Sequence, residues 1–356
     1  MLFATVSLGA STLRSVPTVA RLAANWQISQ LTEAAKLGAP ETGWVQATFY
    51  LGLARWAEYS RDESYFDLIR DIGRRNKWQL GSRTYNADDQ LVGQVYAIVS
   101  DHFRDPLMIE PMTQRFDFIL AHKPMVALTF DKGERCQERW CWSDALFMAP
   151  ATWFALSRLN GDRRYRDYAD AEFWATKSFL FDRNEHLFYR DSRFFGQKGV
   201  YGERIFWGRG NGWVFAALVN ILRELPSNDR SRRRYEALLR EMAGKLITRQ
   251  RADGFWTTSL MSPLKSGTSE SSCTAFFTYG LAAGVNMGLL DRQQFGAAAL
   301  RGWQALTGVI SAGRLGRVQK IGDQPADVDL NDTQAYGSGA LLLAASAVDF
   351  MEKVTH

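Results

Sequence analysis

The sequence predicts an all-α protein built as an (α/α)6 barrel, in which six helical hairpins close into a toroid. Twelve segments carry apolar residues at helical spacing. These segments alternate between nearly apolar ones, rich in Gly and Ala, and charged ones. No group of strand-like segments is large enough for a parallel sheet. Short β pieces are expected only in loops, near 185–207 and 254–260.

The expected helices follow one another as inner and outer members of each hairpin. Segments that are apolar all round belong in an interior, whereas charged amphipathic segments belong outside. Pro150 is expected either to kink its helix or to mark a later start. No low-complexity linker interrupts the chain, so we expect a single domain over 1–356, with residues 1–16 as an N-terminal arm or signal remnant. In chain order the expected helices span 17–29, 44–58, 62–77, 88–101, 106–123, 143–159, 162–181, 209–225, 229–250, 270–287, 291–311 and 331–353.

The composition is that of an ordinary globular protein, with 46% hydrophobic and 23% charged residues. Aromatic residues make up 13% and include 12 Trp, a share common both in sugar-binding proteins and in large helical cores. The net charge is +5, but the basic residues are scattered and the densest run, at 230–234, is expected to be a solvated helix face. We therefore expect no nucleic-acid partner. A mildly positive chain suits an acidic small substrate.

Cysteine and histidine usage excludes several classes of site. The three cysteines form an odd set without framework spacing, which argues against a disulfide scaffold, and Cys273 is expected in the core. Four His without an HExxH or CxxC pattern predict neither a metal nor another cofactor. No stretch approaches the length of a membrane span. Residues 1–12 are apolar but lack the basic start of a secretory signal, so both cytoplasm and periplasm stay open.

The stretch WGRGNGW at 207–213 is the most informative part of the chain. Its Gly and Asn residues, Asn211 included, allow a tight turn, and a helix follows directly. Trp207 and Trp213 offer flat faces for a sugar ring, while Arg209 offers a planar fork for a carboxylate. We expect Arg209 to be half-buried and directed at an anion, near a positive helix N-terminus. The alternative is a Gly-rich helix entry with core Trp residues.

Carboxylates mark the starts of two other inner helices. Asp144 stands among aromatic and apolar residues, including Trp142 and Met148. Burial among such residues raises a carboxyl pKa and produces a general acid, although plain helix capping is the alternative. At Asp88 and Asp89, capping explains one acid and leaves the other to line the pocket. Two carboxylates from separate elements are typical of glycoside cleavage.

In a toroid the N-termini of all inner helices lie on one face, around one central pocket. Trp44 opens the second expected helix, and Tyr336 lies one turn into the last. Glu270 opens the tenth, where it is first expected to be a cap and, alternatively, a substrate ligand. Arg190 lies near Arg209 in the sequence. These side chains are the remaining candidates for substrate binding.

Several motifs together resemble glycoside hydrolase family 105, the unsaturated rhamnogalacturonyl and glucuronyl hydrolases. They occur in the family's order and extend from about Trp44 to the C-terminus. In this sequence they read YNADDQLVGQ, WSDALFMAP, HLFYRDSRFF, FWGRGNGW, ESSCTAFFTYGL, RVQKIGDQP and AYGSGALLLA.

The resemblance implies an (α/α)6 barrel that removes a 4,5-unsaturated uronic acid from the non-reducing end of lyase-generated oligosaccharides. In this reaction an Asp protonates C4 of the enol ether, water adds at C5, the hemiketal opens and the neighbouring sugar leaves. By motif position Asp144 is that acid and also the base that activates water. Asp88 or Asp89 is the second carboxylate, with Asp88 favoured. The resemblance also implies substrate contacts for Trp207, Arg209, Trp213 and Met148.

Two departures from the family pattern leave the substrate open. Arg190 stands where some members carry His, so rhamnose in the adjacent subsite is not assured, and ESSC replaces the ETSG of close relatives. The expected substrate is an acidic unsaturated oligosaccharide, whose terminal sugar could be galacturonyl or glucuronyl. The protein is expected to be a monomer or a homodimer. Two other functions remain: an inverting glycosidase for saturated glycans, using the same carboxylates, and a non-catalytic carbohydrate-binding protein on this fold.

Overall fold

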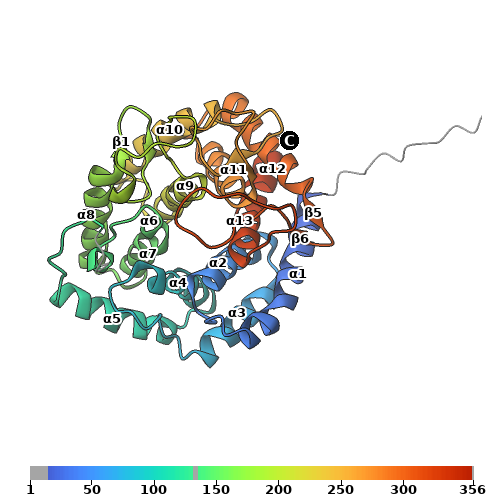
Figure 1. Cartoon of the computed structure of the whole chain (residues 1–356). Helices are drawn as coiled ribbons and strands as arrows, with labels where there is room; N and C mark the ends of the chain where they lie inside the picture. The colour runs from blue at the N-terminus through green and yellow to red at the C-terminus, as the bar shows by residue number, and fades with distance from the viewer. Residues whose placement is uncertain (1–14, 131–134, 355–356) are drawn as a thin grey trace, which may run out of the picture.

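The computed structural model describes residues 15–130 and 135–354, and within them six inner helices surround one centre with six outer helices around them (Figure 1). The predicted (α/α)6 barrel is therefore confirmed. The inner helices are α2 (Trp44–Ser60), α4 (Val92–Phe103), α7 (Pro150–Asn160), α9 (Gly208–Glu224), α11 (Ser271–Asn286) and α13 (Ala335–Lys353). The outer helices are α1 (Val16–Lys36), α3 (Glu63–Arg75), α5 (Glu110–Ala121), α8 (Arg163–Leu180), α10 (Arg232–Thr248) and α12 (Ala297–Thr307).

The core lies between the two rings and along the inner helices. Every residue of α11 from Ser271 to Val285 is buried, as its unbroken apolar and small-residue sequence predicts. Small residues let the inner helices approach closely. A Cβ added to Gly52 of α2 would lie 2.2 Å from the carbonyl oxygen of Gly339 in α13, so only glycine fits this crossing. The close ring leaves little space inside, and the site forms at its end.

Two predicted inner helices begin differently from the sequence expectation. The segment 88–101 starts as a 3-10 turn, η1 (Ala87–Gln90), before α4. The Asn86 side chain caps this turn by accepting from the Asp88 backbone N–H at 3.0 Å, so neither acid is the cap that we expected. The segment 143–159 is divided into the single turn α6 (Ala145–Met148) and α7, with Pro150 at the first position of α7. The later start expected at Pro150 is confirmed.

Other differences concern the ends of helices. The last inner helix, α13, starts at Ala335 rather than 331, and the first outer helix, α1, extends to Lys36 rather than ending at 29. The segment 106–123 comprises η2 (Pro106–Ile109) followed by α5, and 291–311 comprises the π turn η5 (Arg292–Gly296) followed by α12. Two further 3-10 turns lie in loops, η3 (Arg135–Glu138) and η4 (Ser192–Phe194).

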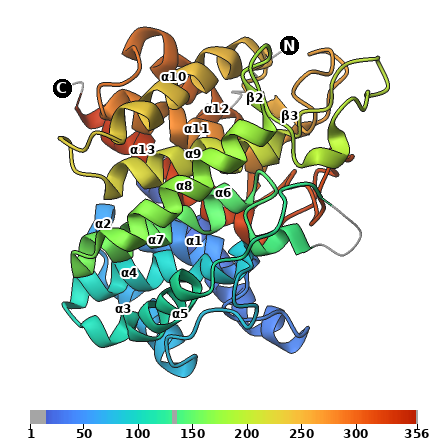
Figure 2. The same ribbon diagram turned by 90° about the vertical axis from the view of Figure 1, so that its left-hand side faces the viewer.

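Within residues 15–130 and 135–354, three two-stranded antiparallel ladders lie in the loops. The expected β pieces include β2 (Leu187–Phe188), which pairs with β1 (Phe181–Asp182), and β3 (Trp256–Thr257), which pairs with β4 (Ser269–Glu270). The pair β5 (Ile310–Ser311) and β6 (Arg314–Leu315) was not predicted. Figure 2 shows β2 and β3 at one end of the barrel, where the long connections gather. This end corresponds to the face seen in Figure 1.

The cysteines differ from the expectation in one respect. Cys136 and Cys141 form a disulfide, a local bridge five residues apart that the argument against a disulfide scaffold did not anticipate. Cys273 is buried, as predicted. Residues 1–14 of the predicted N-terminal arm lie outside the described residues. Among the described helices, none combines the length and apolar character needed to cross a membrane.

Candidate active site

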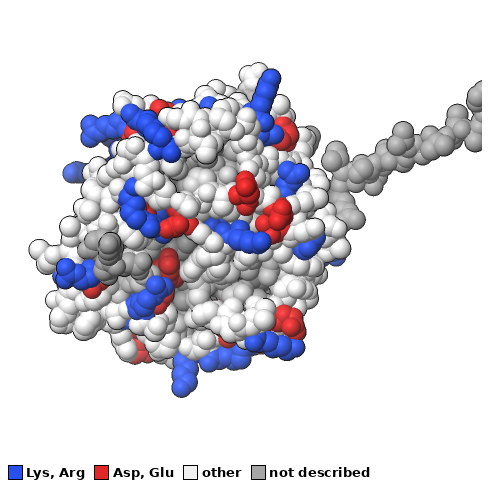
Figure 3. All heavy atoms as spheres, in the orientation of Figure 1, with Lys and Arg blue, Asp and Glu red and all other residues white. Residues whose placement is uncertain are grey.

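The N-termini of four inner segments meet in a small pocket of about 270 Å³. It contains nine of the thirteen residues that the sequence predicted for the site, and lacks Asp89, Asn211, Glu270 and Tyr336. On the face that Figure 1 shows, basic and acidic side chains are intermixed rather than gathered in one basic area (Figure 3). The pocket is lined by Trp44, Asp88, Trp142, Asp144, Met148, Arg190, Trp207, Arg209, Trp213, Ile321, Gly322 and Asp323.

Asp144 lies directly before α6 and is only 8% exposed. Its Oδ2 accepts a 3.0 Å hydrogen bond from the Ser143 hydroxyl and lies 3.7 Å from Arg190 Nε. Burial raises the pKa of Asp144, whereas the charges of Arg190 and Arg209 and the Ser143 hydrogen bond oppose this rise. Asp144 is thus a buried carboxyl that retains its proton to a higher pH than an exposed one.

Asp88 supplies the second carboxyl from η1. Its side chain is 23% exposed, and its Oδ2 lies 3.8 Å from Arg83 Nη2. Burial first, and then the negative charge of Asp144, raise the pKa of Asp88 to about 7, while Arg83 lowers it. Two carboxyls that interact in one pocket titrate as a pair. Both carboxyls therefore retain a proton to higher pH than exposed ones, which suits acid catalysis followed by base catalysis.

Arg209 corrects one expectation. We predicted a half-buried side chain directed at an anion, but Arg209 is 1% exposed. Its Nη1 donates to the Gln319 carbonyl at 2.7 Å, and its Nη2 donates to the carbonyls of Lys320 at 3.0 Å and Gly322 at 3.4 Å. The guanidinium also lies over the Trp207 ring, 4.5 Å from its centroid. The fork therefore holds the loop 319–322 against the pocket, because backbone carbonyls already occupy most of its donors.

Arg190 offers the pocket a donor that no hydrogen bond to a described residue occupies. Its Nη1 donates to Asp191 Oδ2 at 2.7 Å, and its backbone carbonyl accepts from Ser143 N–H at 2.8 Å. Within the described residues, Arg190 Nε is buried without a hydrogen-bond partner. A buried donor without a partner is costly unless a ligand or water satisfies it. Arg190 thus presents a charged donor to the pocket beside Asp144.

Aromatic rings form the other walls. The ring of Trp44 lies edge-on to Trp213, with centroids 6.2 Å apart, and stacks on Tyr336 at 5.3 Å. Trp207 donates its indole N–H to Gln319 Oε1 at 2.9 Å. Trp207 and Trp213 are each only 1% exposed, as the alternative of core Trp residues predicted, so the half-buried Trp44 presents the ring surface that suits the apolar face of a sugar.

Asp89 and Asn211, predicted for the site, are engaged in other contacts. Asp89 accepts from the Arg83 side chain at 2.6 Å and from the Arg83 backbone N–H at 2.7 Å, so it anchors the loop before η1. Asn211 donates to the Phe188 carbonyl at 3.0 Å and accepts from the Phe188 N–H at 2.8 Å, which ties β2 to α9. Both residues support the site without lining the pocket.

Glu270 and Tyr336 hold the loop after β6. Glu270 is the N-cap of α11, as one of the two interpretations predicted; its carboxylate accepts from the N–H groups of Ser272 at 2.9 Å and Cys273 at 2.7 Å. The same carboxylate accepts from Gln319 N–H at 2.9 Å, and the Tyr336 hydroxyl donates to the Gln319 carbonyl. The alternative of a direct substrate ligand does not match these contacts.

The residues Ile321, Gly322 and Asp323 line the pocket but were not predicted. They lie in an irregular loop without helical or strand periodicity, so no pattern placed them near the inner helix starts. The only signal was that they fall within RVQKIGDQP, one of the stretches on which the family resemblance depends.

A six-hairpin barrel whose mouth combines buried carboxyls, a charged donor and fixed aromatic rings defines a carbohydrate-active enzyme. The comparisons with known proteins agree. The chain belongs to Glycosyl Hydrolase Family 88, whose family model matches residues 19–351. It is a glycoside hydrolase. Solved structures described as a member or possible members of family 105 share the fold.

The chain is similar to two named enzymes along most of its length. It is 40% identical to an unsaturated 3S-rhamnoglycuronyl hydrolase of Alteromonas sp. over 91% of this chain and 83% of that protein. It is 34% identical to a protein of the same name from Formosa agariphila over 88% of this chain and 85% of that protein. In fold it matches a family 88 glycosyl hydrolase from Bacteroides vulgatus with a TM-score of 0.83, at 24% identity, covering 95% of this chain and 100% of that chain.

Proposed function

We propose that this glycoside hydrolase removes a 4,5-unsaturated uronic acid from the non-reducing end of an oligosaccharide by hydrating the C4=C5 double bond. One observation carries the proposal: a pocket of about 270 Å³ places two carboxyls of raised pKa beside a charged donor. This volume is at the lower end of ligand pockets and suits one terminal sugar. The positive groups beside the carboxyls suit a sugar that is itself an acid.

Asp144 is the residue that transfers protons in this mechanism. Its carboxyl donates a proton to C4 of the enol ether, and positive charge develops at C5. The resulting carboxylate accepts a proton from water as the water oxygen bonds to C5, which restores the acid. The hemiketal then opens by cleavage of the bond between C5 and the ring oxygen. This leaves a C5 ketone and a hemiacetal at C1, which expels the neighbouring sugar as an alcohol.

Asp88 and Arg190 set the charge around this step. Burial keeps the proton on Asp144 until it is transferred to the substrate, and Asp88 is the second carboxyl of the pocket, which the charge of Asp144 in turn helps to keep protonated. Arg190 Nε, unsatisfied and 3.7 Å from Asp144, is placed to donate to the uronate carboxylate. In this proposal Arg209 contributes positive potential and fixes the loop 319–322, rather than gripping the carboxylate with its fork.

The similar named enzymes support a particular substrate. Two relatives at 40% and 34% identity are called unsaturated 3S-rhamnoglycuronyl hydrolases. We therefore propose an unsaturated glucuronyl residue linked to rhamnose as the preferred terminal disaccharide, although Arg190 replaces the His found in some family 105 members. Two predictions from the sequence accompany this proposal: a monomer or homodimer, and a location in cytoplasm or periplasm.

A panel of unsaturated disaccharides tests the proposal. The conjugated enol carboxylate absorbs in the ultraviolet, and hydration of the double bond removes this absorbance. We expect the absorbance of unsaturated glucuronyl-rhamnose to fall fastest, with the galacturonyl epimer and a glucosamine-linked disaccharide as comparisons. A matched saturated glucuronyl-rhamnose should not be cleaved. Cleavage of the saturated sugar at a similar rate would instead favour the inverting glycosidase.

A further inference from the structure

Asp191 is a fully buried carboxylate that the proposed reaction does not use. Its side chain is 0% exposed, and it caps the 3-10 turn η4 in the connection between β2 and α9. Its Oδ1 accepts from the Arg193 backbone N–H and from Arg193 Nε, both at 2.9 Å. Its Oδ2 accepts from Arg193 Nη2 at 2.8 Å and from Arg190 Nη1 at 2.7 Å. Two guanidinium groups therefore compensate the burial of its charge.

Arg190 lies between this carboxylate and the carboxyl of Asp144. Its Nη1 donates to Asp191, whereas its Nε lies 3.7 Å from Asp144 Oδ2, which is too long for a hydrogen bond. The Arg190 backbone carbonyl accepts from Ser143 N–H at 2.8 Å, so the backbone holds the two segments side by side. One arginine thus forms a direct ion pair with Asp191 but not with the catalytic acid.

The two carboxyls are both buried, but their pKa values move in opposite directions. Burial raises the pKa of Asp144, and the charges of Arg190 and Arg209 oppose this rise without cancelling it. Burial also acts to raise the pKa of Asp191, yet its hydrogen bonds with Arg193 and Arg190 hold that pKa below its usual value. Asp191 is therefore already ionised at a pH where Asp144 still carries its proton.

Arg193 holds Asp191 in place from the other side. Its guanidinium lies over the Phe130 ring, 4.1 Å from the centroid, and its Nη2 also pairs with Asp323 at 2.8 Å. Because Asp323 lines the catalytic pocket, this pair joins η4 to the loop after β6. The two arginines and the two carboxylates of this group balance in charge, so the group needs no negative charge from the catalytic acid.

The charged groups that line the pocket with Asp144 are Asp88, Arg190, Arg209 and Asp323. Arg209, from α9, donates to backbone carbonyls of the loop after β6, which occupy most of its donors. Asp88, from η1, is the second carboxyl, and Asp323 is paired as described. Arg190 Nε is the charged donor without a hydrogen-bond partner among the described residues. Arg190 is therefore the cation that can form a closer ion pair with Asp144.

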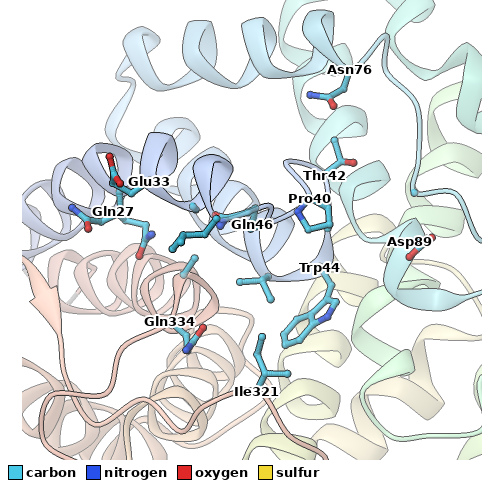
Figure 4. Close-up of a pocket in the computed structure, with 18 of the residues that line it drawn as sticks. Gln27, Glu33, Pro40, Thr42, Trp44, Gln46, Asn76, Asp89, Ile321 and Gln334 are labelled. Carbon is cyan, nitrogen blue, oxygen red and sulfur yellow. The ribbon is translucent and has the colours of Figure 1, made fainter.

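A larger pocket of about 970 Å³ adjoins the catalytic pocket (Figure 4). The two pockets share the uncharged residues Trp44 and Ile321 in their linings. Asp89 of the larger pocket accepts from Arg83 at 2.6 Å, so this carboxylate does not compete with Asp191 for Arg190. The charged lining residues of the larger pocket are Glu33, Arg83 and Asp89.

We propose that Asp191 is a positioning residue, which holds Arg190 toward the uronate carboxylate and away from a direct ion pair with Asp144. This proposal rests on the proposed function, in which Asp144 is the acid. Without the charge of Asp191, the guanidinium of Arg190 turns to Asp144, its remaining carboxyl partner. A direct ion pair favours the ionised form of Asp144 and thereby removes the proton that the reaction needs.

The fall of kcat/KM at alkaline pH tests this role. Asp191→Asn removes the charge and keeps nearly the same shape, so Arg190 should close the 3.7 Å gap to Asp144. Shortening this distance to about 2.8 Å, at an effective dielectric constant of about 20, lowers the pKa of Asp144 by about one unit. The kcat/KM for unsaturated glucuronyl-rhamnose should therefore fall about one pH unit earlier than in the wild-type protein. An unmoved fall would overturn the proposal.

Arg190→Met shows whether the shift passes through the arginine. In this variant the fall should lie at higher pH than in the wild-type protein, because a charge that favours ionised Asp144 is gone. Adding Asp191→Asn to it should move the fall much less than in the wild-type background. An equal shift in both backgrounds would contradict the proposal. The matched control is Asp229→Asn, since Asp229 also pairs with an arginine, Arg166, but beside the outer helices α8 and α10; it should leave the fall unchanged.

Failure of the proposed function gives a separate result. If no unsaturated disaccharide is hydrolysed, carboxyl carbon NMR of aspartate-labelled protein still follows the titration of Asp144, whose signal is assigned by its loss in Asp144→Asn. The titration midpoint should fall by about one unit in Asp191→Asn and rise in Arg190→Met. An unchanged midpoint in Asp191→Asn contradicts the proposal, whether or not the enzyme is active. If circular dichroism shows that Asp191→Asn does not fold, Arg190→Met decides: a raised midpoint supports the proposal, and an unmoved one overturns it.

Discussion

Replacing Asp88 by Asn is expected to stabilise the protein at alkaline pH. The pKa of Asp88 is raised to about 7 in the folded protein, from 3.8, by burial and by the charge of Asp144. The folded state therefore binds a proton more tightly than the unfolded state between pH 4 and pH 7. Stability from this proton is fully present below about pH 4 and is lost as pH rises through about 7. Above that pH the folded protein contains an unfavourable carboxylate.

The structure sets the size of this effect. A shift of about 3 pKa units corresponds to at most about 4 kcal/mol. Since 23% of the Asp88 side chain is exposed and Arg83 lies 3.8 Å away, we expect a smaller gain. We expect Asp88→Asn to raise the free energy of unfolding by about 1–2 kcal/mol at pH 8, and by much less at pH 5.

Urea denaturation followed by tryptophan fluorescence at both pH values measures this gain. The matched control is Asp89→Asn, the same substitution one residue later, where the carboxylate accepts three hydrogen bonds from Arg83. That variant should be less stable than the wild-type protein at pH 8. If Asp88→Asn loses stability at pH 8, or gains equally at both pH values, the assignment of a raised pKa to Asp88 is wrong.

The remaining predictions concern activity and the loop. The kcat/KM should fall at alkaline pH as Asp144, whose pKa is raised by burial, loses its proton. In Asp88→Asn this fall should move to lower pH, because a neutral neighbour disfavours ionisation of Asp144 less than a carboxylate does; an unmoved profile would contradict the coupling. Arg190→Met should raise KM for the unsaturated disaccharide about tenfold or more, and unchanged kinetics would remove Arg190 from carboxylate binding. Arg209→Met should lower the free energy of unfolding by about 2–3 kcal/mol in addition to reducing kcat/KM, whereas a rise in KM with unchanged stability would show that its fork grips substrate after all.

The sequence predicted the parts of the site that lie at inner helix starts. Alternation of apolar and charged helical segments indicated the barrel, and a barrel of this kind places helix N-termini together. Asp88, Asp144 and Trp213, which are distant in sequence, line one pocket for that reason. The expectation depended on the periodicity of long helices, which is the most reliable local signal.

The predictions that the structure corrects concern contacts that the local sequence does not encode. Nothing in WGRGNGW indicates that Arg209 donates hydrogen bonds to backbone carbonyls of the loop 319–322. That loop lies more than a hundred residues later in the chain. The same loop accepts a hydrogen bond from Tyr336, which was expected to contact substrate, and it donates one to Glu270, whose role as a cap was predicted but whose contact with Gln319 was not. The local pairing of Cys136 with Cys141 also escaped prediction, since spacing alone does not specify a bridge.

The most direct test of the proposed chemistry compares two rates in one reaction. Unsaturated glucuronyl-rhamnose is incubated with the wild-type protein and with Asp144→Asn, while ultraviolet absorbance reports the double bond and chromatography reports free rhamnose. With the wild-type protein, absorbance should fall at least as fast as rhamnose appears, and Asp144→Asn should reduce both rates by about a thousandfold or more while remaining folded. Rhamnose that appears first, while the absorbance persists, would contradict double-bond hydration, and full activity in Asp144→Asn would contradict the assignment of the acid.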